Sequence, residues 1–194
     1  MKFTVGGDNR NGSTSVKSGT RGEPRDENYN VTSENRYKKF NRVLEQRAGT
    51  GAATITTRLE TSSEYIGFNK DNYECQGLTF KSKGTVELPQ DPATIGHGIV
   101  NESIWMNIRI NETGKVQLVA SVIADLDVAE VSLQGPSFAK PVRIYDDYDQ
   151  LLDITKPGEY SLRGGYQLSV KVPATGLGGR PITVEISAKL TPAS

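Results

Sequence analysis

The stretch Ser103–Ile110, which reads SIWMNIRI, decides the fold class of this chain. Every second residue is large and apolar, and these residues share one face of an extended strand: Ile104, Met106, Ile108 and Ile110. The opposite face carries Trp105, Asn107 and Arg109. This period of two residues predicts a half-buried β-strand in an antiparallel sheet.

Runs of the same kind recur from Ala52 to the end of the 194-residue chain. They are rich in β-branched residues, turn signals of Gly, Pro and Asn separate them, and no helical period lies between them. About ten or eleven short strands are expected. The sequence therefore predicts an all-β protein, in which residues 52–194 form an antiparallel β-sandwich of jelly-roll type.

One of these runs, KPGEYSLRGGYQLSVKV, contains two adjacent glycines near its middle. It predicts a hairpin with Arg163–Gly165 as the turn, because Gly-Gly pairs are frequent turn residues. The second half places four residues on one face: Tyr166, Leu168, Val170 and Val172.

The first part of the chain, residues 1–32, is rich in Gly, Asn, Ser, Thr and Arg and poor in apolar residues. Such a segment buries too little surface to offset its ordering entropy, which is about 1–2 kcal/mol per residue. We therefore expect an extended polar arm that a partner must order.

Residues 33–48 carry the one helical signal. Thr32 or Ser33 can cap a helix, and Tyr37, Phe40 and Leu44 follow at helical spacing. A short amphipathic helix is expected here, with its apolar stripe packed on the sandwich or on a partner. The interface residues predicted for it are Arg36, Tyr37, Phe40, Val43 and Leu44.

The charge is balanced, with 23 basic and 23 acidic residues. Residues 1–47 carry a net charge of +4 and the remainder −4. This asymmetry is too small for a nucleic-acid-binding arm, but it suits an arm that docks on a second copy of the chain. No apolar run is long enough to span a membrane, and Cys75, the one cysteine, is expected to be a small buried hydrophobe.

Two acidic groups are candidates for a calcium site: Asp146, Asp147, Asp149 and Asp153, and then Asp125, Asp127 and Glu130. Neither has the spacing of a calcium-binding EF-hand loop, and His97 is the single histidine. No pattern assigns a nucleophile, a base and an orienting group. We therefore predict no metal, no cofactor and no enzymatic activity.

The aromatic residues leave a binding function open. Four of them are candidates for a sugar-stacking platform of the kind found in carbohydrate-binding modules: Trp105, Tyr145, Tyr148 and Tyr160. Core packing is the alternative use of the same side chains.

The polar arm, the short helix and the sandwich together resemble the plan of virus and bacteriophage virion proteins, such as jelly-roll coat, decoration and penton-like proteins. The resemblance covers the whole chain and implies a structural or assembly role in the virion, with copies of itself or other virion proteins as partners. A carbohydrate- or receptor-binding β-sandwich module is the alternative.

Overall fold

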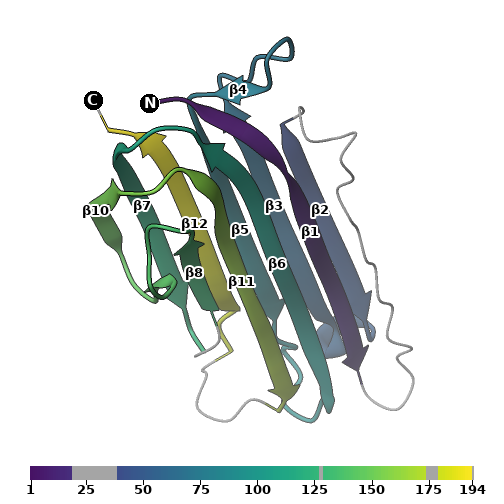
Figure 1. Ribbon diagram of the computed structural model, residues 1–194. Helices are drawn as coiled ribbons and strands as arrows, with labels where there is room; N and C mark the ends of the chain where they lie inside the picture. The colour runs from purple at the N-terminus through teal and green to yellow at the C-terminus, as the bar shows by residue number, and fades with distance from the viewer. Residues whose placement is uncertain (19–38, 127–128, 174–178, 194) are drawn as a thin grey trace.

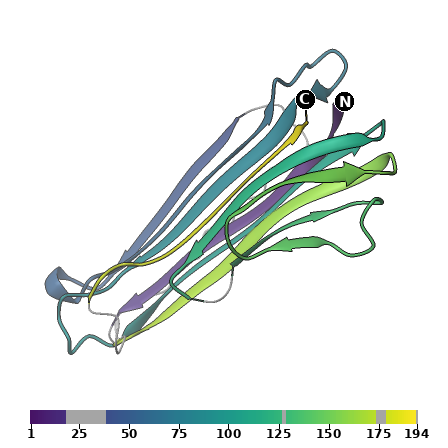
Figure 2. The same ribbon diagram turned by 90° about the vertical axis from the view of Figure 1, so that its left-hand side faces the viewer.

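The computed structural model describes residues 1–18, 39–126, 129–173 and 179–193. Within these ranges the chain forms two six-stranded antiparallel sheets that pack face to face (Figure 1 and Figure 2). This arrangement confirms the predicted all-β antiparallel sandwich.

Sheet A has the order β4-β1-β6-β11-β8-β9. Its strands are β1 (Phe3–Ser18), β4 (Glu74–Cys75), β6 (Gly96–Ile110), β8 (Ala129–Gln134), β9 (Val142–Ile144) and β11 (Gly158–Val172). Sheet B has the order β10-β7-β12-β5-β3-β2. Its strands are β2 (Phe40–Ala48), β3 (Ile55–Ile66), β5 (Gly77–Glu87), β7 (Gly114–Ala124), β10 (Tyr148–Ile154) and β12 (Ile182–Pro192).

Most consecutive strands lie in opposite sheets, as in jelly-roll-like sandwiches. A 3-10 turn at Gly51–Ala53 is the one helical element of the described residues.

The inward faces of the central strands follow the predicted alternation. The apolar residues of β6 that SIWMNIRI places on one face are fully buried, whereas Trp105 on the other face is 44% exposed. The predicted apolar face of β11, from Tyr166 to Val172, is also buried. Cys75 is buried as expected, and burial raises the pKa of its thiol to about 11.

The prediction of an extended arm over residues 1–32 is wrong for Phe3–Ser18. This segment is β1, a strand that pairs with β6 along its whole length, from Phe3 opposite Ile110 to Ser18 opposite Gly96. A ladder of backbone hydrogen bonds and a buried inner face offset the ordering entropy. Residues 19–32 lie outside the described residues.

The sequence concealed β1 for two physical reasons. A β-bulge between Val5 and Gly7 shifts the register, so the inward positions change from odd to even numbers along the strand. After the bulge several inward residues are small or polar, including Arg10 and Thr14. The usual alternation of apolar and polar residues is therefore absent.

The helix predicted over residues 33–48 is also wrong where the structure describes it, because Phe40–Ala48 is strand β2 at an edge of sheet B. Phe40 and Leu44 are four residues apart, and this spacing returns to the same face of a strand as well as of a helix. The ladder with β3 decides in favour of the strand, with Phe40 opposite Ser63 and Ala48 opposite Ile55. Residues 33–38 lie outside the described residues.

The hairpin predicted around Arg163–Gly165 does not form, because β11 runs without a break from Gly158 to Val172. Gly164 lies in the middle of this strand and faces sheet B. A Cβ atom there would lie 2.5 Å from Cζ of Phe80 and 2.9 Å from Cδ1 of Ile186. The glycine therefore provides space for the opposing sheet rather than freedom for a turn.

Polar side chains link the two sheets beside β1. Buried Arg10 donates from Nη1 to Oγ1 of Thr61 on β3, at 3.1 Å, and Thr61 donates to Oε1 of buried Glu102, at 3.3 Å. The Tyr65 hydroxyl of β3 donates to the Gly7 carbonyl at the bulge, at 2.7 Å. Because buried polar groups require partners, these bonds allow a polar strand to belong to the core.

The position of Gly164 leads to a stability prediction. Gly164→Ala should lower the free energy of unfolding by about 1–3 kcal/mol, because the added methyl group overpacks the contact with Phe80. Urea denaturation measures the change. Gly165→Ala is the matched control, since its Cβ points outward and meets Glu102 O at 3.1 Å, so the loss should be smaller. Equal losses in the two variants would contradict this account.

The buried polar link leads to a second prediction. Arg10→Met should destabilise the protein by about 3 kcal/mol, because it removes the buried cation that Thr61 links to the buried Glu102 carboxylate. The double variant Arg10→Met with Glu102→Met should regain most of that loss in the same denaturation experiment. Exposed Arg109→Met serves as the control and should change stability by less than about 1 kcal/mol. A stable single Arg10 variant would refute the structural role of this link.

Candidate binding groove

The register of sheet A brings four outward side chains into one row across its outer face. Trp105 on β6 lies opposite Arg163 on β11, and Arg163 lies opposite Ser132 on β8. Ser132 in turn lies opposite Arg143 on β9. Because neighbouring strands are about 4.8 Å apart, the two arginines start from backbones separated by roughly 10 Å.

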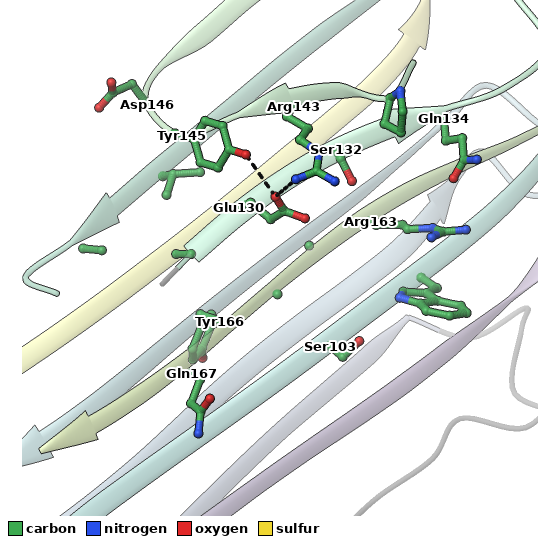
Figure 3. A pocket seen from close by; sticks show the side chains of 17 residues that line it. Ser103, Glu130, Ser132, Gln134, Arg143, Tyr145, Asp146, Arg163, Tyr166 and Gln167 are labelled. Carbon is green, nitrogen blue, oxygen red and sulfur yellow. Dashed lines mark hydrogen bonds and ion pairs between the residues drawn. The ribbon is translucent and has the colours of Figure 1, made fainter. Parts of the chain in front are cut away.

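A hollow of about 810 Å³ lies along this row (Figure 3). Gly165, the next outward residue of β11, lies between Ser103 and Glu130 and fills none of the space. Hydrogen-bonding side chains line much of the hollow: Ser103, Glu130, Ser132, Gln134, Arg143, Arg163 and Gln167. Val122 and Ala124 of β7 also line it, so the hollow includes residues of sheet B.

Trp105 and Arg163 form a stacked pair in this hollow. The guanidinium carbon of Arg163 lies 4.5 Å from the centre of the Trp105 ring. Its Nε donates to Oγ of Ser161, at 3.2 Å. These two contacts orient the guanidinium on the outer face of the sheet.

A second cluster joins β8 to the end of β9. An Arg143 nitrogen lies 3.6 Å from Oε2 of Glu130, and the Tyr145 hydroxyl donates to the same oxygen at 3.4 Å (Figure 3). The pKa of Arg143 is raised, first by its hydrogen bond with the Tyr145 side chain and then by the charge of Glu130. Tyr145 is 56% exposed, so its ring remains available at the surface.

A second hollow of about 590 Å³ adjoins the first. Both hollows share Gln134, Pro141 and Arg163, and the second continues along β11 to Glu159. Lys140 and Phe138, in the connection from β8 to β9, also line it. The two hollows therefore adjoin along β11 at Arg163, and together they are called the groove below.

The structure brings together some of the predicted aromatic residues. Trp105 and Tyr145 line the first hollow. Tyr160 lines the second, but its ring is buried and its hydroxyl donates to the Lys156 carbonyl, at 2.6 Å. Tyr148 lies on β10 of sheet B and lines neither hollow.

The predicted interface residues do not lie in the groove. Arg36 and Tyr37 are outside the described residues. Leu44 is buried between the sheets, and Phe40 is half-buried with the Arg10 guanidinium 4.8 Å from its ring centre. Val43 points the other way and is 56% exposed.

The acidic residues serve mainly as hydrogen-bond acceptors. Asp147 accepts from Ser121 at 2.6 Å, Asp149 from Gln117 at 2.7 Å, and Asp125 from the Thr183 backbone at 2.8 Å. Asp127 lies outside the described residues. No cluster of three or more metal-ligating side chains occurs in the part of the chain that is described. His97 lies at the start of β6, between Lys17 and Lys171.

Sequence reasoning missed Arg143, Arg163 and Gly165 as groove residues. The usable signal was the Gly164–Gly165 pair, because glycine inside a strand often marks a close approach or an open surface. The sequence around Arg143 and Arg163 did not mark them as neighbours, since only strand pairing places them in one row.

Within the described ranges, none of the helical structure has the length and apolar character needed to cross a bilayer. No family model matches this chain, and no curated protein matches it either. Among solved structures, it is similar to a GH31 α-xylosidase from Xanthomonas citri, at 8% identity and a TM-score of 0.25. The likeness covers 94% of this chain and 28% of the enzyme, and a score this low supports no conclusion about fold or activity.

Proposed function

We propose that this chain is a non-enzymatic binding module and that the groove on the outer face of sheet A binds a carbohydrate. The observation that carries the proposal is the pairing of two exposed aromatic side chains, Trp105 and Tyr145, with polar side chains in one hollow. Sugar rings present both apolar C–H faces and hydroxyl groups, so a receptor needs both kinds of surface.

The polar lining suits hydroxyl groups. Gln134 and Gln167 each offer an amide donor and acceptor, and Ser103 and Ser132 each offer a hydroxyl. Glu130 offers carboxylate oxygens, one of which already accepts from Tyr145. This combination supports a neutral or charged oligosaccharide better than a purely apolar ligand.

Trp105 is the one tryptophan of the chain, and it gives a direct test of this proposal. Titration with a panel of neutral and acidic oligosaccharides should change its fluorescence, because bound sugar alters the surroundings of the indole. Calorimetry should then show that Tyr145→Ala weakens binding by about fivefold or more. Leu151→Ala, which removes an equally exposed side chain from sheet B, should bind normally. A panel without any response would overturn the proposal.

A structural role in a virus particle is the second candidate, and the open edge of sheet B favours it. Among the described strands, β2 pairs with β3 alone, so one side of β2 offers backbone groups to another chain. Val43 is exposed on this edge strand. Copies of the chain, or other virion proteins, would pair there, and the chain would then reside in the virion. The arm that first suggested this role is part of sheet A over Phe3–Ser18.

Mass in solution tests the assembly role. If β2 mediates self-association, the protein should form oligomers whose mass increases with concentration. Val43→Lys should shift them to monomers, because lysine on an edge opposes pairing. Val119→Lys, on the outer face of the interior strand β7, should leave the mass unchanged. A wild-type protein that stays monomeric at high concentration would contradict self-association.

A further inference from the structure

We propose that the ligand of the groove is an acidic oligosaccharide and that Arg163 binds a carboxylate of its central sugar. This inference rests on the proposed carbohydrate-binding function and specifies its ligand class. It follows from the position of Arg163, from the donors that its guanidinium leaves available, and from the charges around it.

Arg163 occupies the junction of the two hollows and lines both. Its guanidinium is already oriented by the Trp105 ring, and its Nε is used by Ser161. In the described part of the chain, neither Nη1 nor Nη2 takes part in a hydrogen bond or ion pair. These two nitrogens form a planar fork of donors, which matches the two oxygens of a carboxylate.

The carboxylates that line the groove lie beyond ion-pair distance of Arg163. Glu130 lies against Arg143 at 3.6 Å, and Glu159 lies against Arg109 at 3.9 Å. For Arg163 and for Lys140 of the second hollow, no described carboxylate lies within 4.0 Å. Asp146 is drawn on the far side of the Tyr145 ring from Arg163 (Figure 3). An anion at the junction would therefore contact Arg163, and Lys140 lines the adjoining second hollow.

The shape of the groove specifies an extended ligand. Along β11 it runs from Glu159 to Gln167, which is about 26 Å at the rise of a strand. Hydroxyl and amide side chains continue on both sides of Arg163, including Ser103, Gln134 and Gln167. A single small anion would leave these groups unused, whereas a chain of several sugars would contact them.

The test compares ligands that differ only in the carboxylate. The full chain is titrated by calorimetry, at physiological ionic strength, with oligogalacturonate, hyaluronan and oligosialic acid fragments and with the methyl ester of each. At least one acid should bind about tenfold or more tightly than its ester, because a charge-assisted bidentate bond is lost on esterification. Sulfated dextran fragments form a third arm, which distinguishes carboxylate recognition from general anion binding.

Arg163→Gln should remove the preference for the acid, so that each acid and its ester bind with similar affinity. Lys171→Gln is the matched control, since it removes the same charge from the same strand and face beyond both hollows, and it should keep the preference. Equal binding of acid and ester, or an Arg163→Gln variant that keeps its preference, would overturn the inference while leaving carbohydrate binding intact. Stronger binding of the sulfated fragments would overturn the carboxylate assignment, and no binding of any sugar would overturn both proposals.

Discussion

The antiparallel ladder between β6 and β11 is the constraint on which the rest of the structure depends. It pairs the two strands from Gly158 opposite Ile110 to Val172 opposite Gly96. In each strand every second side chain points into the core, so the side chains between them point to the outer face. The same ladder therefore sets the hydrophobic packing and places Trp105 beside Arg163. A slip of one residue would bury the arginine and expose the core.

The contacts between the two sheets are mainly apolar in one part of the sandwich and polar in another. Around β6 and β11 the contact is mainly apolar, with one buried hydrogen bond between the hydroxyls of Tyr166 and Ser82, and Gly164 lets Phe80 of sheet B approach closely. Beside β1 the contact is polar and depends on hydrogen bonds from Arg10, Thr61 and Tyr65. A buried polar contact requires particular partners, so it favours one register of β1 over its neighbours. The bulge near Gly7 belongs to this arrangement, because its carbonyl accepts the Tyr65 hydroxyl.

The groove lies mainly on sheet A, and no residue of β2 lines it, so the two candidate functions do not compete for the same residues. Sheet A presents aromatic rings, amides and arginines around a hollow at Gly165, which has no side chain to fill it. Sheet B presents the edge strand β2, which among the described strands pairs with β3 on one side and with no strand on the other. A protein that assembles through one sheet and binds a glycan through the other would be compatible with both features.

The sequence by itself determined the class of the fold, because a two-residue period in SIWMNIRI and YQLSVKV has one physical meaning when turns separate short runs. It also predicted the buried face of residues 104–110 in β6 and of residues 166–172 in β11. Only the tertiary structure decided that Phe3–Ser18 and Phe40–Ala48 are β-strands. Their local patterns are weak or fit two periods, and the hydrogen-bond ladders to β6 and β3 resolve them. The groove belongs to the second category as well. Its members come from four strands, and only register across a sheet makes neighbours of Trp105, Arg163, Ser132 and Arg143.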